Sequence, residues 1–481
     1  MLNSTLLIIL RTFREEEIRR FDDFVRSPYF NKNTNVIKLY AIVKKYFPDL
    51  KSEYLNREKI WKELFQEKSF NYGIMKNLIY ELQKLIEKFL SYSVYEIYGS
   101  DQKRNLLENL ISKGLDRHFE KNLKTFKSEL GKLPDNADNF YYKYLTEAKE
   151  QNYLSLRYKT TEAGFCNPAK MNDNLISFFF VNFFTDNYNT LHDSLLYNKK
   201  YNMEILESVF EFFNKSPARE NEFVLMNYYT LKTLTDLNDN SSFNELKTLL
   251  QKNYKKFKHE TVYNFSMALI NFCNFNIMKG KAGYIKEQFV LYKFIIENGY
   301  YSSLSKNFIN PNLYANAVSM AGNLNEFEWA ENFISDFKHK LHPLQRDSYF
   351  ALANVSLNIK KKKFDKALSY LSQFKCTNVI DKITQKRFQI IIYYESGFIN
   401  ELYSLIDTSK HFISYDKKVT ESAKSIFEKF LNFTLKLSHV KTRKQNDKYD
   451  KYYLESLINE ILASDVSNKI WLLEKAEELN I

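Results

Sequence analysis

The sequence has few of the residues that mark turns, with ten glycines and seven prolines among its 481 residues. Glycine and proline punctuate tight turns, and a sheet protein with many hairpins would use more of them. Their scarcity excludes a fold built mainly from hairpins. It favours many helices joined by short polar connections, and we predict an all-α fold.

Cysteines and long apolar runs are also scarce. Cys166, Cys273 and Cys376 are about a hundred residues apart, and this spacing and odd number are typical of free thiols in a reducing compartment. The longest apolar stretch, Leu175 to Phe184, is far shorter than the roughly 20 residues that span a bilayer. Leu6 to Leu10 has no preceding basic segment of the kind found in secretion signals. We therefore predict a cytoplasmic protein without membrane insertion.

Recognisable motifs for catalysis, cofactors and metals are missing. His339 and His342 have helical spacing, but no partner motif for a metal accompanies them. His259-Glu260 has no second histidine at zinc-protease spacing, and Gly280 to Gly283 lacks the Ser or Thr that follows lysine in a phosphate loop. We predict that the protein is not an enzyme, and we assign no catalytic, cofactor-binding or metal-binding residue.

Positive charge is in excess, since 70 Lys and Arg face 58 Asp and Glu and the formal net charge is +12. A basic balance can attract nucleic acid, but both signs alternate along most of the expected helices. In the first hundred residues the basic candidates are Lys44, Lys45, Lys84 and Lys88. We interpret Lys360 to Lys363 as a solvated turn and Lys252 to His259, with its interleaved rings, as a helix with one apolar side. Nucleic acid is thus a possible partner, but a less favoured one than protein.

Four amphipathic stretches with short links fill the first hundred residues, at about 12–26, 34–47, 56–65 and 74–89. Thr12 and Glu15 have the spacing of a capping box at the start of the first, and Asn56 can cap the third. Ser27-Pro28 ends the first helix, because a residue before proline disfavours helical geometry. This four-helix module is either a structural cap or a winged-helix-like binding head.

The run Phe21 to Asn31, with Asn77-Leu78 and Phe89-Leu90 downstream, resembles the start of a group of uncharacterised bacterial helical proteins. The resemblance covers about the first 95 residues and implies no function. Within it, Ser27-Pro28-Tyr29-Phe30-Asn31 is interpreted as a rigid interhelical turn with both rings packed inward. A recognition loop is the alternative.

From about residue 140 the pattern changes to helix pairs of similar length. The clearest unit runs from Tyr349 to Leu371, with Ala367 early in its second helix, and Leu313 to Phe337 matches it with Ala330. Ala330 and Ala367 are 37 positions apart, and the next unit places Leu402 a further 35 along. Weaker analogues extend the pattern backward at steps of 41 and 43, at Ile205, Leu246 and Glu287.

A period of 35 to 43 with helix–turn–helix content is typical of a solenoid of stacked pairs. These units resemble tetratricopeptide repeats, in which a small residue early in the second helix lets the two helices approach. The pattern is incomplete, because Val318 and Val355 occupy the small position of the first helix and the terminal proline is missing. The resemblance implies an α-α superhelix that binds protein segments, but the family's peptide-clamp residues cannot be assigned here.

The end of the chain is typical of a terminal cap. Ala423 to Leu431 stripe a long helix, His439 to Lys451 is predicted as a loop, and two shorter helices follow at Tyr453 to Ile461 and Ile470 to Ala476. A solenoid must cover its last apolar face, so these helices are expected to cap the array or to form a dimer contact.

The sequence thus predicts an α-α superhelix with three parts: a four-helix module at 1–98, a tetratricopeptide-like array at 99–415 and a helical cap at 416–481. The favoured function is a non-catalytic scaffold or adaptor that binds a protein or peptide in a groove lined by Tyr, Phe and Asn from first helices. The alternative is a nucleic-acid-binding or transcription-regulatory protein with residues 1–98 as its binding head. The partner-binding residues and the oligomeric state are left open.

Overall fold

A computed structural model describes residues 4–51, 53–157, 168–197, 201–302, 308–416, 419, 421–445 and 451–480. Within these ranges the chain forms 23 α-helices and four 3-10 helices and no strand, which confirms the all-α prediction. Among the described helices, none is both long and apolar enough to cross a membrane. The chain divides into two compact units, residues 1–131 with 149–163, and residues 132–148 with 164–481.

The first unit contains α1 (Thr5–Leu10), α2 (Glu15–Arg26), α3 (Thr34–Lys44), α4 (Arg57–Leu64), α5 (Tyr72–Tyr98), α6 (Ser100–Ser112) and α7 (Asp116–Lys132). Its helices α1 to α5 enclose one apolar core. The fully buried members include Leu7, Phe21, Val25, Leu39, Val43, Leu82 and Ile86. The structure thus contains the four helices predicted for residues 1–98 and adds α1, whose Leu6, Leu7 and Leu10 complete this core.

The capping box predicted at Thr12 and Glu15 is wrong by two residues. Thr12 instead donates its hydroxyl to the carbonyl oxygen of Ile9, at the end of α1. The backbone N–H of Arg14 donates to Glu17 Oε2 at 2.9 Å, so Glu17 satisfies the free amide at the start of α2. The Asn56 cap is confirmed, because its side chain accepts from the backbone N–H of Glu58 at 2.8 Å.

The turn from Ser27 to Asn31 packs one of its two rings rather than both. Phe30 stacks on Phe24 with ring centroids 4.0 Å apart, whereas Tyr29 is 82% exposed. Asn31 holds the turn, because its Nδ2 donates to the carbonyl oxygen of Val25 at 2.9 Å. The prediction of an interhelical turn is confirmed, and the inward packing of Tyr29 is wrong.

Helix α8 (Ala137–Leu156) belongs to the second unit up to residue 148 and to the first unit beyond it. In the first unit, Tyr153 of α8 packs on Phe119 of α7 with ring centroids 4.3 Å apart. Arg157 donates to Asp116 Oδ1 at 3.0 Å. These contacts fix the end of α8 against α7.

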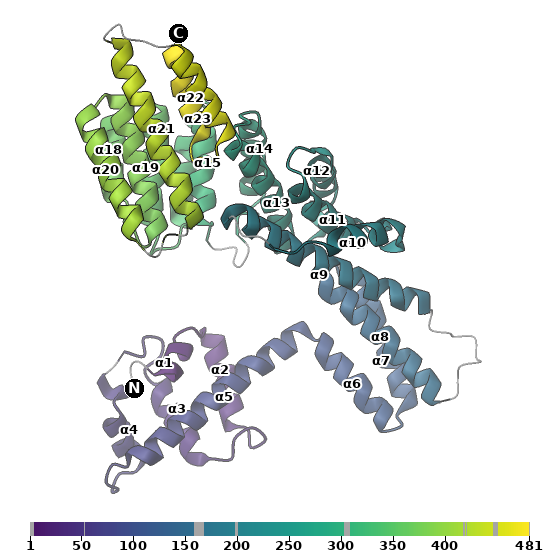
Figure 1. Cartoon of the computed structure of the whole chain (residues 1–481). Coiled ribbons are helices and arrows are strands. Elements are labelled where there is room, and N and C mark those ends of the chain that lie inside the picture. The colour runs from purple at the N-terminus through teal and green to yellow at the C-terminus, as the bar shows by residue number, and fades with distance from the viewer. Residues whose placement is uncertain are drawn as a thin grey trace. The chain divides into compact units, whose positions relative to one another are not determined.

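The second unit continues with a series of helix pairs (Figure 1). The first helices of the pairs are α9 (Pro168–Tyr197), α11 (Glu222–Thr235), α13 (His259–Met278), α15 (Pro311–Asn323), α17 (Arg346–Lys360) and α19 (Val379–Ser396). The second helices are α10 (Ile205–Lys215), α12 (Ser241–Asn253), α14 (Tyr284–Glu297), α16 (Phe327–Phe337), α18 (Phe364–Gln373) and α20 (Ile399–Tyr415). Most first helices contact the next first helix along the chain, as α9 does with α11, α11 with α13, and α15 with α17, whereas α15 packs on α14. This is the packing of a superhelical α-α arrangement.

Three residues chosen for their spacing occupy the same structural position. Ala330, Ala367 and Leu402 are each the fourth residue of a second helix, in α16, α18 and α20. All three are fully buried. The more distant analogue Ile205 is 59% exposed and begins α10, so the regularity weakens toward the start of the array.

The turns inside these pairs also repeat. Gly280, Asn325, Lys362 and Gly397 have positive φ, between 55° and 92°, and each follows the first helix of a pair. In each turn the next backbone N–H donates to the carbonyl five residues back, as Lys363 does to Asn358 at 2.8 Å. A left-handed residue followed by this hydrogen bond is the usual way to end a helix and start an antiparallel neighbour. The turn at Lys360 to Lys363 is therefore confirmed.

The C-terminal part of the second unit consists of α21 (Glu421–Gln445), α22 (Lys451–Ala463) and α23 (Lys469–Asn480). Helix α21 continues to Gln445, so the loop predicted from His439 is wrong over 439–445, and residues 446–450 lie outside the described residues. Phe427, Phe430 and Leu431 are buried in α21 as their stripe predicts. Helix α23 packs on α21 and α22 and also contacts α13, although the pairs from α15 to α20 lie between them in the sequence.

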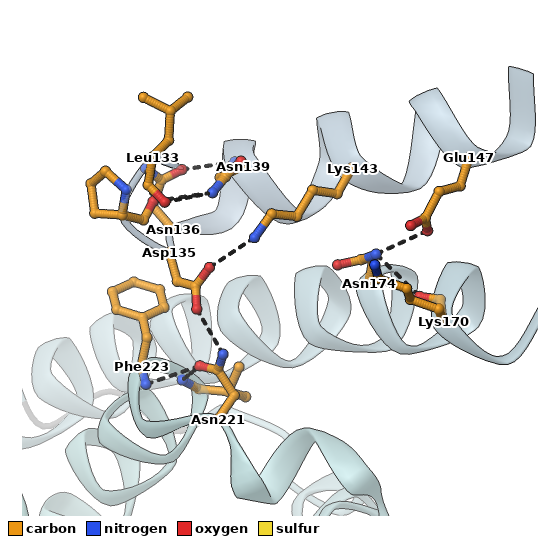
Figure 2. A network of polar contacts seen from close by, with 12 residues as sticks. Leu133, Asp135, Asn136, Asn139, Lys143, Glu147, Lys170, Asn174, Asn221 and Phe223 are labelled. Carbon is orange, nitrogen blue, oxygen red and sulfur yellow. Dashed lines mark hydrogen bonds and ion pairs between the residues drawn. The ribbon is translucent and has the colours of Figure 1, made fainter. Parts of the chain in front are cut away.

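A polar network joins the start of α8 to α9 and α11 (Figure 2). Asp135 accepts from Lys143 Nζ at 3.0 Å and from Asn221 Nδ2 at 2.7 Å. Asn221 Oδ1 in turn accepts from the backbone N–H of Phe223, which caps α11. The charges are thus paired and the helix start is satisfied, so we assign the network a structural role.

Candidate functional site: two clefts on the first helices

Two clefts open on the second unit, and first helices of the pairs form most of their walls. The amide cleft, of about 530 Å³, lies on α9, α11 and α13. It is lined by Ala137, Val181, Thr185, Tyr188, Asn189, His192, Phe223, Asn227, Thr230, Thr261, Asn264, Phe265, Met267, Ala268 and Asn271. The C-terminal cleft, of about 590 Å³, is lined mainly by α13, α15, α17, α19 and α23.

Helical spacing explains which residues face the C-terminal cleft. On α15 these are Asn312, Asn316, Ser319 and Asn323, separated by three or four positions. On α19 they are Ile380, Thr384, Arg387, Ile391 and Glu395, again at steps of three or four. Such residues share one side of a helix. Each first helix therefore presents one side to the cleft, and that side carries both polar and apolar residues.

The amide cleft offers hydrogen-bonding groups without a net charge cluster. Asn271 donates to the Tyr188 hydroxyl at 3.1 Å, and burial raises the pKa of Tyr188 to about 12, so this phenol stays protonated. Asn227 donates to the carbonyl of Phe223 at 2.8 Å, and its Oδ1 accepts from Thr185 at 3.2 Å. Asn264 is exposed on the same cleft. An amide side chain both donates and accepts, as a peptide group does.

Helix α23 forms one wall of the C-terminal cleft through a shared carboxylate on α19. Glu395 Oε1 accepts from Trp471 Nε1 at 2.8 Å and pairs with Lys475 Nζ at 3.0 Å. Lys475 also pairs with Glu478 at 2.7 Å. Burial opposes the charge on Lys475, but its hydrogen bonds and the attraction of Glu478 and Glu395 outweigh burial and raise its pKa.

The buried side chains of α23 show that this wall of the cleft is packed into the folded core. Trp471, Leu472 and Leu479 are buried in the C-terminal core. Three large side chains contribute about 5–9 kcal/mol if each contributes about 1.5–3 kcal/mol. A contribution of that size is comparable to the stability of a whole domain. The helix is therefore part of the fold, and the open volume beside it is the part that a ligand can occupy.

Three cations that form no ion pair within the described residues face the same cleft. Arg387 projects from α19, its Nε is enclosed without a hydrogen-bond acceptor, and burial lowers its pKa. Lys360 and Lys362 come from the end of α17 and the following turn. Within the described residues, none of the three forms an ion pair at 4.0 Å or less. The stem of Lys360 lies over Gly322, where an added Cβ would be 3.2 Å from Lys360 Cγ.

The lysines of the predicted solvated turn, Lys360 to Lys363, have different environments in the structure. Lys361 pairs with Glu331 on α16, while Lys360 and Lys362 line the cleft. The interpretation of this run as a solvated turn is therefore incomplete. Residues two apart lie on opposite sides of an ideal helix, but the positive φ of Lys362 turns its side chain back toward the cleft side.

Among the described residues, the histidines, the Gly280 to Gly283 segment and the cysteines considered in the sequence analysis have contacts that stabilise the fold or lie in turns. His342 Nδ1 accepts from the backbone N–H of Leu344, and His259 Nε2 lies against the carbonyl of Gly299. Gly280 to Gly283 forms the turn between α13 and α14, as expected. Cys273 is buried, burial raises its pKa to about 12, and Cys166 lies outside the described residues. In the described part of the chain, no three His, Cys, Asp or Glu side chains are grouped as metal ligands.

The rings and lysines between Lys252 and His259 are also accounted for. Phe257 packs 5.7 Å from Phe223, and Tyr254 packs 5.2 Å from Phe294, measured between ring centroids. Lys252 pairs with Glu222. The apolar side of this segment is confirmed, but its interpretation as one helix is wrong, because α12 ends at Asn253, a 3-10 turn follows at Tyr254–Lys256, and α13 begins at His259.

The polar cleft residues were missed in the sequence because hydrophobic periodicity marks only the packed sides of a helix. The remaining signal was weak but present: Asn312, Asn316 and Asn323 recur at helical steps between the buried positions of α15. Comparison of the chain with protein-family models, with curated proteins and with solved structures finds no significant match.

Proposed function

We propose that this protein is a non-catalytic scaffold or adaptor that holds a segment of another protein in the clefts of its helix-pair array. The observation that carries the proposal is the lining of the C-terminal cleft. It combines exposed amides, such as Asn312 and Asn316, with apolar side chains, such as Leu352 and Ile391. Mixed linings of this kind are typical of peptide grooves, where apolar pockets give affinity and polar groups fix orientation.

We further propose that α15 to α20 form three tetratricopeptide-like repeats. The equivalent burial of Ala330, Ala367 and Leu402 supports this assignment, as do the repeated left-handed turn residues. A cytoplasmic location remains our expectation, and the buried, free thiol of Cys273 is compatible with it.

The alternative, a nucleic-acid-binding head at residues 1–98, is less well supported because three of its four candidate lysines have acidic partners. Lys44 pairs with Asp22 at 3.2 Å, Lys84 pairs with Glu87 at 2.7 Å, and Lys45 pairs with Glu63. Lys88 lies over the ring of Phe30 at 5.1 Å. A nucleic-acid site needs cations that are free to release counterions from phosphate.

Site-specific photo-cross-linking of the full chain in its native cell tests the proposal. A photoreactive residue replaces Asn312 in the cleft, and the matched control replaces Lys366, which is exposed on α18 outside both clefts. We expect one polypeptide to be cross-linked from position 312 and not from 366. Adding Ser319→Trp, which fills the cleft, should abolish that product. Equal cross-linking from both positions, or a nucleic-acid adduct, would contradict the proposal.

A further inference from the structure

We propose that the segment bound in the C-terminal cleft is acidic and that Arg387 binds one of its carboxylates. This inference rests on the proposed protein-binding function and names the chemistry of the partner. Arg387 lies on α19 between Thr384 and Ile391, one turn away on either side, and all three line the cleft. Its Nε is enclosed and has no acceptor within the described residues.

Arg387 is partly buried, and its enclosed Nε–H costs free energy, because burial removes water from this donor and no acceptor replaces it. Buried polar groups in folded proteins are otherwise almost always hydrogen-bonded. A carboxylate on a ligand would supply the missing acceptor, since guanidinium and carboxylate form two parallel hydrogen bonds. The lowered pKa of Arg387, which burial causes, agrees with this unbalanced environment.

The other charges around the cleft favour the same conclusion. Among its carboxylates, Glu395 and Glu478 are engaged by Lys475, and Asp381 accepts from the hydroxyl and backbone N–H of Thr377. Within the described residues Glu474 forms no ion pair, and neither do the cations Arg387, Lys360 and Lys362. With Lys469 and Lys475, five cations and four carboxylates line the cleft, so its net charge is slightly positive. The unpaired cations are therefore the groups that an acidic segment would complement.

The lining also argues for a polypeptide over a nucleic acid. Four carboxylates lie on the same walls, at Asp381, Glu395, Glu474 and Glu478. These carboxylates disfavour a strand that carries a phosphate at every nucleotide, whereas a segment with only one or two acids can place them at the cations. Between them lie Leu352, Phe388 and Ile391, which an apolar side chain can contact. A segment with one or two acids set among apolar residues fits this pattern.

A displayed library of random 12-residue peptides, selected on the immobilised full chain, tests the inference without assuming a partner. Peptides whose binding is blocked by Ser319→Trp are synthesised with a fluorescent label, and their affinities are measured by anisotropy. We expect such peptides to share an Asp or Glu. Arg387→Met should weaken them at least tenfold, and Arg387→Lys should weaken them less. The matched control Arg219→Met, an exposed arginine outside both clefts, should change affinity less than twofold.

Replacing the shared acid of the peptide by its amide should give the same loss as Arg387→Met, and the two losses should not add. Arg387→Met should leave the melting temperature unchanged or raise it, because an enclosed donor without an acceptor is removed. A large fall in melting temperature would instead indicate a structural arginine and overturn the inference.

The outcomes separate the two proposals. Cleft-bound peptides without a shared acid, or with affinities insensitive to Arg387→Met, overturn the acidic-partner inference and leave the scaffold intact. If Ser319→Trp blocks no selected peptide, the proposed function itself fails. If a labelled 20-nucleotide thymidine strand binds and loses affinity with Arg387→Met, the cleft binds phosphate and the inference is wrong.

Discussion

Replacing Glu395 with alanine removes a carboxylate that two side chains of α23 share, so it tests how this helix is held. Trp471 Nε1 donates to Glu395 at 2.8 Å, and Lys475 Nζ lies 3.0 Å from it. The side chains of Lys475 and Glu395 are only 10% and 19% exposed. Screening by water is therefore weak, and this pair belongs with buried rather than surface ion pairs.

The expected cost follows from the groups left behind. Breaking a buried pair by removing one partner costs about 3–5 kcal/mol, and a buried N–H without an acceptor costs about 1–3 kcal/mol. Lys475 keeps Glu478, but that carboxylate is 61% exposed, and such a pair contributes about 0–1 kcal/mol. These effects share one site and do not add fully, so we expect Glu395→Ala to destabilise the docking of α23 by about 3–5 kcal/mol.

Urea unfolding followed by tryptophan fluorescence measures this cost. The chain has three tryptophans, so replacing Trp61 and Trp329 with Phe leaves Trp471 as the reporter of α23. With a slope of about 2–3 kcal/mol per molar urea, the midpoint should fall by about 1–2 M. Glu395→Gln should cost less, because its amide oxygen still accepts from Trp471 and only the charge is lost.

Two controls make the result specific. Glu477→Ala removes an exposed carboxylate from the same helix and should change the midpoint little. The double variant Glu395→Leu, Lys475→Leu replaces the pair with apolar groups and should recover most of the loss. If Glu395→Ala costs no more than Glu477→Ala, the assignment of Glu395 as the anchor of α23 is wrong.

Three further predictions concern the array. Burial raises the pKa of Cys273 and Tyr188 to about 12, so the folded state keeps protons that the unfolded chain loses above about pH 8.5 and about pH 10. The free energy of unfolding should therefore fall as pH rises through this window, by about 1.4 kcal/mol per pH unit and group. In Cys273→Ala, urea midpoints should no longer fall between about pH 8.5 and about pH 10, where only the thiol contributes. Lys362→Gly should raise the free energy of unfolding by about 0.5–1 kcal/mol and the thermal midpoint with it, because φ is 55° at this residue. An equal gain from Lys363→Gly, where φ is −98°, would contradict this cause. Ala367→Leu should cost about 1–3 kcal/mol by overpacking the crossing of its helix pair, and a neutral result in the same assay would show that the helices do not approach closely at this residue.

The sequence predicted those features that depend on local pattern. The spacing of Ala330, Ala367 and Leu402 identified one structural position in three pairs, because a small or buried residue is required wherever two helices cross. Helix ends were predicted where a helix-terminating residue such as proline follows within a few positions, as at Ser27-Pro28. Where several local solutions compete, the prediction failed. Thr12 satisfies the end of α1 rather than the start of α2, and Glu17 does the capping instead.

Features that depend on distant contacts could not be predicted. The stretch from His439 has too many polar residues for an expected helix, yet α21 extends to Gln445 because α19, α20 and α23 pack along it. Tyr29 was expected inside on composition alone, but the Asn31 hydrogen bond fixes a turn in which only Phe30 reaches the core. The return of α23 to α13 depends on the superhelical twist, which no local window contains.

The candidate site belongs to this second class, and the reason is physical. Except for α9, each first helix packs on its own second helix and on at least one other first helix, so only a narrow stripe remains for the cleft. Residues on that stripe are not required for folding, and polar ones there are indistinguishable in sequence from those on a solvated surface. Arg387 illustrates the point: nothing in the local sequence distinguishes it from an arginine on a solvated surface, whereas the structure places it in the cleft with its Nε enclosed and without an acceptor. The fold does not supply the missing acceptor, which is why the search for its partner should begin with an acid.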